Sequence, residues 1–220
     1  MASNSYWLLV VLLFLLWLWA GGMFYKYPSW ALAMLLPLMA WLLFDPAVLA
    51  LGNWLGEGPS LQVLTYLRHL LRALAMPFLL VVAFDQAKRA RVRWTDDPLL
   101  ALGLGMVIVA LLALGLVKGM WGLQLVITES EGIKQYKPED PLGLPWAALG
   151  TAGLLALLGA GVLAKTRTPW LLLGGLAMLV SLFPLPLSSV VLAASSLVLV
   201  LGFLLTEIKL HKIAPPLVIR

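Results

Sequence analysis

Seven apolar stretches, most of them close to the length that crosses a bilayer, constrain this chain more than any other feature of its sequence. They lie near residues 7–25, 29–51, 61–84, 98–118, 146–164, 169–183 and 188–206. Only 11% of the 220 residues are charged, whereas soluble domains have about 25%. We therefore predict an all-α fold, a polytopic transmembrane bundle of about seven helices that forms a single integral membrane domain over residues 1–220.

Two of the stretches decide how many times the chain crosses the membrane. The sixth is short and ends at Phe183-Pro184-Leu185-Pro186, so we expect stretches six and seven to form a tight hairpin at one membrane face. If they formed one re-entrant element instead, the N-terminus would move to the other side.

The first stretch is too long for a signal peptide and lacks a basic leader, so we expect it to be retained.

The positive charges of the loops predict the orientation of the bundle. With alternating loops, one side holds Lys26, Lys88, Arg89, Arg91, Arg93, Lys165, Arg167, Lys209, Lys212 and Arg220. The other side holds Lys118, Lys134 and Lys137. Because cytoplasmic loops carry the excess of lysine and arginine, we expect the N-terminus outside and the C-terminus inside. We also expect the membrane to be a bacterial plasma (inner) membrane.

A polar stripe interrupts the third stretch. Gln62, Thr65, Arg68, His69 and Arg72 recur at spacings of three and four, so they share an arc of roughly 120° on a helix. An arginine near the bilayer centre costs roughly 2.5–3.5 kcal/mol on insertion scales. We therefore expect this face to turn toward water, a counter-charge or a ligand.

Counter-charges for the stripe are few. Asp45, in the outer half of the second stretch, is expected at a similar depth and should pair with Arg68 or Arg72. Glu57 in the outer loop is the only other nearby acid, so positive charge remains in surplus. Either water, snorkelling and carbonyls freed by prolines satisfy the guanidinium groups, or they bind an anion such as a phosphate or carboxylate headgroup.

Two further regions carry most of the remaining charge. Residues 119–145 form the outer loop, in which apolar residues come first and charged residues follow. We therefore expect an interfacial segment followed by a solvated loop. This loop is either a lid over the polar stripe or a plain connector. The run from Asp85 to Asp97 should be a solvated helix end near anionic headgroups. Glu207, Lys209 and His211 should mark the same membrane border.

Several classes of protein are disfavoured. The chain has no cysteine, and its two histidines, His69 and His211, lie at opposite ends of the predicted bundle, so we expect no metal site and no cofactor. The last stretch has no lysine before Lys209, which disfavours a retinal protein. The net charge of +5 fits topology and lipid contact rather than nucleic acid.

One segment resembles a known family. Asp45, Leu51-Gly52, Leu55-Gly56-Glu57-Gly58, Arg68, Ala73-Leu74, Pro77 and the run from Asp85 to Ala90 look like an uncharacterised bacterial multi-pass membrane family, sometimes labelled phospholipid phosphatase. The resemblance covers residues 45–90, and the family pattern has a histidine where this chain has Arg72. It implies that Asp45, Glu57, Arg68 and Arg72 belong to one outward-facing site.

These observations leave three functional hypotheses. In the first, the protein is not an enzyme, and an outer-half cavity binds or passes an anionic amphiphile such as a lipid headgroup. The candidate ligand-binding residues are Arg68, His69, Arg72, Asp45, Thr65, Gln62 and Glu57. In the second, the protein is a subunit or assembly factor of a larger membrane complex, and partner helices cover its faces. In the third, it is a lipid-phosphate enzyme, although no catalytic nucleophile is evident.

Overall fold

The structure, a computed structural model, describes residues 2–120, 125–130, 133–138, 145–182 and 189–213. The helices are α1 (Ala2–Lys26), α2 (Trp30–Leu55), α3 (Pro59–Arg89), the 3-10 helix η1 (Arg93–Asp96), α4 (Pro98–Met120), α5 (Trp146–Thr166), α6 (Trp170–Ser181) and α7 (Ser189–Ile213). The strands are β1 (Leu125–Ser130) and β2 (Ile133–Pro138). The predicted all-α bundle of seven helices is confirmed for the described residues, with one small β-hairpin added.

Six of the described helices are long and apolar enough to cross a membrane, so the chain is a multi-span integral membrane protein. The exception is α6, whose 12 residues extend only about 18 Å, less than the roughly 30 Å of a hydrocarbon core. The expected turn at residues 183–186 and the basic residue Arg220 lie outside the described residues.

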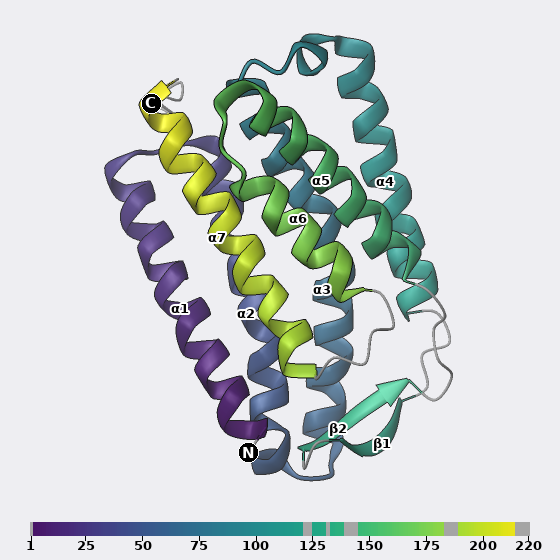
Figure 1. The fold of residues 1–220 in the computed structure, drawn as a ribbon. Helices are drawn as coiled ribbons and strands as arrows, with labels where there is room; N and C mark the ends of the chain where they lie inside the picture. The colour runs from purple at the N-terminus through teal and green to yellow at the C-terminus, as the bar shows by residue number, and fades with distance from the viewer. Residues whose placement is uncertain (1, 121–124, 131–132, 139–144, 183–188, 214–220) are drawn as a thin grey trace.

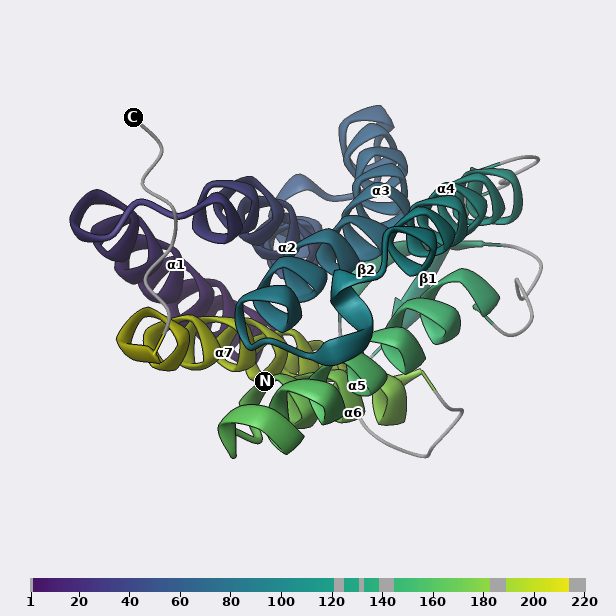
Figure 2. The same cartoon turned by 90° about the horizontal axis from the view of Figure 1, so that it is seen from above.

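The helices run side by side and alternate in direction (Figure 1). One end of the bundle carries the N-terminus, the start of α3 and the β-hairpin, and we call it the hairpin end. The other carries the end of α7 and the links from α1 to α2, from α3 to α4 and from α5 to α6, and we call it the C-terminal end. Seen from above, α1 and α4 lie at opposite flanks (Figure 2).

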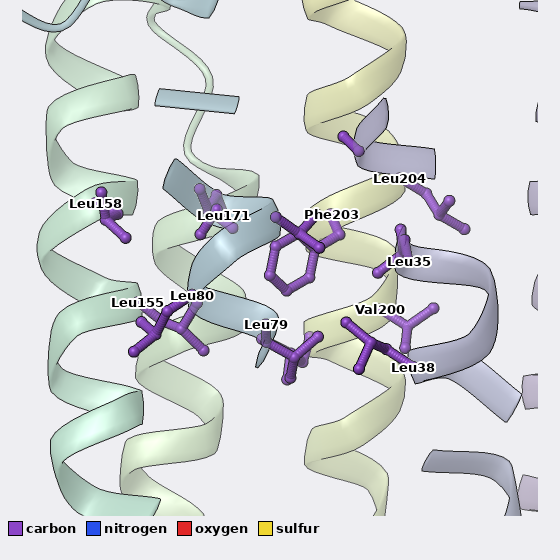
Figure 3. Packing of buried hydrophobic residues seen from close by; sticks show 14 of the residues in the cluster. Leu35, Leu38, Leu79, Leu80, Leu155, Leu158, Leu171, Val200, Phe203 and Leu204 are labelled. Atoms are coloured by element: carbon purple, nitrogen blue, oxygen red, sulfur yellow. The ribbon is translucent and has the colours of Figure 1, made fainter. Parts of the chain in front are cut away.

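The core lies where α2, α3, α5, α6 and α7 meet (Figure 3). Leu35, Leu79, Leu155, Leu171 and Phe203 come from these five helices, and each is at most 1% exposed. The flanking helices contribute less, since only 17% of the α1 span and 11% of the α4 span is buried. The outer faces of α1 and α4 are therefore the surfaces left to lipid.

Two glycines allow the short helix α6 to approach both of its neighbours closely. A Cβ atom on Gly159 of α5 would lie 2.5 Å from the amide nitrogen of Leu172 in α6. A Cβ atom on Gly202 of α7 would lie 2.6 Å from the carbonyl oxygen of Trp170. Backbones this close need small residues, and they hold α6 between α5 and α7.

The expectation of a solvated loop over residues 119–145 is wrong at its centre. Residues 125–138 contain an antiparallel hairpin in which Leu125 opposes Pro138 and Ser130 opposes Ile133. The β-branched run Val126, Ile127 and Thr128 favours a strand, and the charges around it obscured this signal. Tyr136 is buried against α2 and α3, which fixes the hairpin over this end of the bundle.

Helices α3 and α7 extend beyond the predicted boundaries of 61–84 and 188–206. The prediction of a solvated helix end is confirmed for Lys88, Arg91, Arg93, Asp96 and Asp97, which are exposed. It is wrong for Arg89, whose side chain is only 14% exposed and pairs with Asp85 and Glu207. Gln86, which the sequence did not single out, is fully buried. Glu207 likewise lies inside the bundle and is only 2% exposed, whereas a place at the membrane border was expected. Packing between α3 and α7 continues one to two turns past the apolar stretches, and it encloses these polar side chains.

Candidate functional site

An ion pair between α2 and α3 is the first element of the site. Arg68 Nε lies 3.3 Å from Asp45 Oδ1, and the two side chains are 13% and 28% exposed. The predicted pairing of Asp45 with an arginine of the stripe is therefore confirmed, and Arg68 is the partner. Asp45 Oδ1 accepts no hydrogen bond of good geometry from the described residues, so the contact is mainly electrostatic.

Arg72 lies one helical turn beyond Arg68 and is exposed. None of the ion pairs among the described residues involves it. Its side chain lines two cavities, whose linings share Arg72, Met76 and Leu182. The expected surplus of positive charge is thus located on Arg72, since Asp45 compensates Arg68.

The larger cavity lies between α3, α4 and α5, and we call it the α4–α5 cavity. It has a volume of about 510 Å³. Its lining comprises His69, Arg72, Ala73, Met76, Pro77, Leu114, Gly115, Lys118, Pro145, Trp146, Ala147, Ala148 and Leu182. Arg72 and Lys118 are its cations, and this lining contains no carboxylate. Most of its remaining wall is apolar. The cavity therefore combines a cationic part with an apolar part, as a site for an amphiphile requires.

The first turn of α5 adds positive potential to the α4–α5 cavity. The residue before this helix is Pro145, which makes no side-chain capping hydrogen bond. The first amides of a helix have no partner within the helix, and they carry part of its positive dipole. Because Trp146, Ala147 and Ala148 line the cavity, this helix start faces the same space as Arg72 and Lys118.

The smaller cavity lies between α2, α3, α6, α7 and the β-hairpin, and we call it the hairpin cavity. It has a volume of about 260 Å³. Its polar lining consists of Asp45, Arg68, Arg72, Gln135, Lys137, Ser181, Ser195 and Ser196. The hairpin contributes Gln135 and Lys137, so it forms part of the cavity wall. Ser195 donates a hydrogen bond of 3.1 Å to Ser181 and joins α7 to α6 beside this space.

The rest of the predicted stripe divides among different environments. His69 lines the α4–α5 cavity only, and its Nε2 is buried with no hydrogen-bond partner among the described residues. Thr65 is buried and donates its hydroxyl proton to the Leu61 carbonyl at 2.8 Å. Gln62 is half-buried and Glu57 is exposed, and neither lines these two cavities. The structure brings Asp45, Arg68 and Arg72 together.

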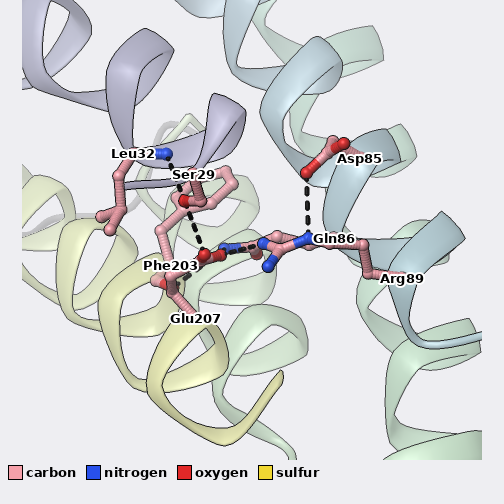
Figure 4. Close-up of polar contacts among 7 residues, drawn as sticks. All are labelled: Ser29, Leu32, Asp85, Gln86, Arg89, Phe203 and Glu207. Atoms are coloured by element: carbon pink, nitrogen blue, oxygen red, sulfur yellow. Dashed lines mark hydrogen bonds and ion pairs between the residues drawn. The ribbon is translucent and has the colours of Figure 1, made fainter. Parts of the chain in front are cut away.

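A second polar cluster, missed by the sequence reasoning, lies at the C-terminal end (Figure 4). Ser29 donates to Glu207 Oε1 at 2.8 Å, and Gln86 donates to Glu207 Oε2 at 3.1 Å. Arg89 pairs with Glu207 and also with Asp85, at 3.1 Å. The cluster links α2, α3 and α7. One signal for it exists in the sequence, because Gln86 continues the buried face of Leu79, Val82 and Ala83 in α3.

Comparison with family models, curated proteins and solved structures finds no match to this chain. The fold defines its class, the multi-span integral membrane proteins. The resemblance over residues 45–90 stays a prediction, and the site is interpreted from the chain's own residues.

Proposed function

We propose that the α4–α5 cavity binds the headgroup of an anionic lipid and holds part of its acyl chain against the apolar wall. The single observation that carries this proposal is Arg72. It has no carboxylate partner among the described residues, and it lies beside a cavity that also contains Lys118 and an uncapped helix start.

Arg72 has no compensating carboxylate among the described residues. A membrane-embedded arginine costs roughly 2.5–3.5 kcal/mol, and Asp45 offsets this cost for Arg68 but not for Arg72. A phosphate or carboxylate group would supply the missing charge, and the planar guanidinium binds either group through two parallel hydrogen bonds. Lys118 and the first amides of α5 would add further donors to the same anion.

The shape and lining of the cavity favour an amphiphile over a small free anion. Its volume of about 510 Å³ lies within the usual range of ligand pockets, which is about 300–1,000 Å³. Met76, Leu114 and Leu182 give it an apolar wall that an inorganic anion would not use. A lipid uses both parts, because its headgroup needs the cations and its chain needs the apolar wall.

We also propose that the cavity belongs to the outer half of the membrane. In the described residues, the C-terminal end of the bundle carries Lys26, Lys88, Arg91, Arg93, Lys165, Arg167, Lys209 and Lys212. The hairpin end carries Lys118, Lys134 and Lys137. The excess of positive charge on cytoplasmic sides supports a C-terminal end that faces the cytoplasm of a bacterium, with the lipid taken from the outer leaflet of its inner membrane.

Native mass spectrometry tests this function directly. Purified protein is titrated with phosphatidylglycerol, and the number and affinity of bound lipids are compared between the parent and Arg72→Ala. We expect one lipid to bind about tenfold more weakly or worse, since a hydrogen bond to a charged group contributes about 1.5–3 kcal/mol. Arg93→Ala removes the same charge from an exposed position at the opposite end and should change nothing. Equal lipid binding by Arg72→Ala and the parent would refute the proposal.

A further inference from the structure

A third cavity opens at the C-terminal end of the bundle, far from the proposed outer site. It lies between α1 and α7 and reaches the start of α2, and its volume is about 440 Å³. We call it the α1–α7 cavity. Figure 1 shows that α1 and α7 lie side by side, with the end of each helix at this face of the bundle. Both walls are membrane-crossing helices, so the space opens where lipid headgroups and acyl chains meet.

The rim of the α1–α7 cavity is basic. Lys26 ends α1, and His211 and Lys212 lie in the last turn of α7. Lys26 and Lys212 are exposed, and none of the ion pairs among the described residues involves them. The Lys26 ammonium lies 5.3 Å from the centre of the Tyr27 ring, and that ring lies 4.1 Å from the His211 ring. These contacts bring Lys26, Tyr27 and His211 together at the rim.

The floor of the cavity contains one acid, Glu207, which is paired with Arg89. Its Oε1 accepts from Ser29, and its Oε2 accepts from Gln86 and Arg89. Ser29 caps the start of α2, and Gln86 and Arg89 lie on α3. The basic rim therefore has no acid of its own, and the surplus charge of Lys26 and Lys212 is open to an external anion.

The wall of the cavity on α1 is apolar and leaves empty space. Trp19, Gly22, Met23 and Lys26 recur at spacings of three and four, so they share one face of the helix. A Cβ atom added to Gly22 would meet no other atom within 4 Å. An acyl chain can occupy this space, with its headgroup at the level of Lys26.

We infer that the α1–α7 cavity binds one anionic phospholipid from the leaflet at the C-terminal end of the bundle. The phosphate lies between Lys26 and Lys212 beside His211, and one acyl chain follows Trp19 and Met23 along α1. Basic pockets between membrane helices bind anionic headgroups in this manner. The inference does not rest on the proposed outer site, since the two cavities share no residue.

The experiment titrates the full chain with phosphatidylglycerol and measures lipid binding by native mass spectrometry. The variant Lys26→Ala/Lys212→Ala should weaken one bound lipid by about 30-fold, the factor expected for two lysines near a headgroup. Gly22→Phe should weaken the binding of the same lipid, because the added ring fills the space beside Gly22. Phenylalanine has a higher helix propensity than glycine, so this variant tests the cavity without loss of folding. The control Lys88→Ala/Lys165→Ala removes two exposed charges from the same end and should leave binding unchanged.

Three results would overturn the inference. The first is unchanged affinity in both cavity variants. The second is equally tight binding of phosphatidylcholine, which would remove the need for the basic rim. The third is displacement of the lipid by millimolar inorganic phosphate, which would make this a site for a free anion. Arg72→Ala should weaken the binding of the lipid in the α4–α5 cavity and leave the binding of the lipid in the α1–α7 cavity unchanged. The two proposals can therefore fail independently, and the variants show which one has failed.

Discussion

Replacement of Glu207 by glutamine should destabilise the bundle. The carboxylate of Glu207 is 2% exposed and accepts hydrogen bonds from Ser29, Gln86 and Arg89. An amide in its place keeps the volume, loses the charge and directs an N–H₂ group toward one of these donors. The substitution therefore breaks an ion pair and places two donors opposite each other.

The size of the effect follows from the partners that remain. Breaking a buried ion pair by removal of one member costs about 3–5 kcal/mol. Arg89 keeps Asp85 as a partner at 3.1 Å, so its charge stays partly compensated and the lower end of that range applies. We expect a loss of about 3 kcal/mol. For a chain of this size that loss lowers the melting temperature by roughly 6–12 °C.

Thermal unfolding in detergent, followed by intrinsic tryptophan fluorescence, measures this difference. Asp96→Asn is the matched control, because it makes the same carboxyl-to-amide change at an exposed position near the same end. Its melting temperature should stay within about 1 °C of the parent, as surface changes are usually worth less than 0.5 kcal/mol. A Glu207→Gln protein that melts as the Asp96→Asn protein does would show that the cluster contributes no net stability.

Two further stability predictions use the same assay. Gly159→Ala should cost about 1–3 kcal/mol, because its Cβ would lie 2.5 Å from the Leu172 nitrogen, whereas Gly153→Ala, with open space around it, should not destabilise the protein. Asp45→Asn should cost about 3 kcal/mol by leaving Arg68 without its counter-charge. The double variant Asp45→Asn/Arg68→Met should recover part of this loss, and strictly additive effects of the two changes would contradict a direct interaction between them.

The ion pair between Asp45 and Arg68 was predictable because depth in a membrane helix follows from residue count. A fixed rise of 1.5 Å per residue places both side chains at similar levels of neighbouring antiparallel helices. The same arithmetic gives the order of Arg68, His69 and Arg72 along α3. It does not give their neighbours, since these depend on which helices pack on each side of α3. For that reason the sequence placed His69 and Arg68 in one cavity, whereas they line different ones.

The Glu207 cluster and the β-hairpin were missed for different physical reasons. A hydropathy window ends a span at the first charges, so Arg89 and Glu207 were assigned to the membrane border and Gln86 was passed over. In the folded chain, these groups compensate one another and remain buried between helices. The hairpin was missed because its strand signal is only a few residues long, and its stability comes from Tyr136 packing on α2 and α3.

Photo-cross-linking with a phosphatidylglycerol analogue that carries a diazirine on its acyl chain tests the central claim most directly. The protein is labelled in bilayers, and the modified peptides are mapped by mass spectrometry. If the α4–α5 cavity holds a lipid, labelling should concentrate on Ala73 and Met76 and should fall to background in Arg72→Ala. Uniform labelling of the exposed α4 residues Leu102 and Val109, with Ala73 and Met76 unlabelled in the parent protein, would contradict a lipid site at this cavity.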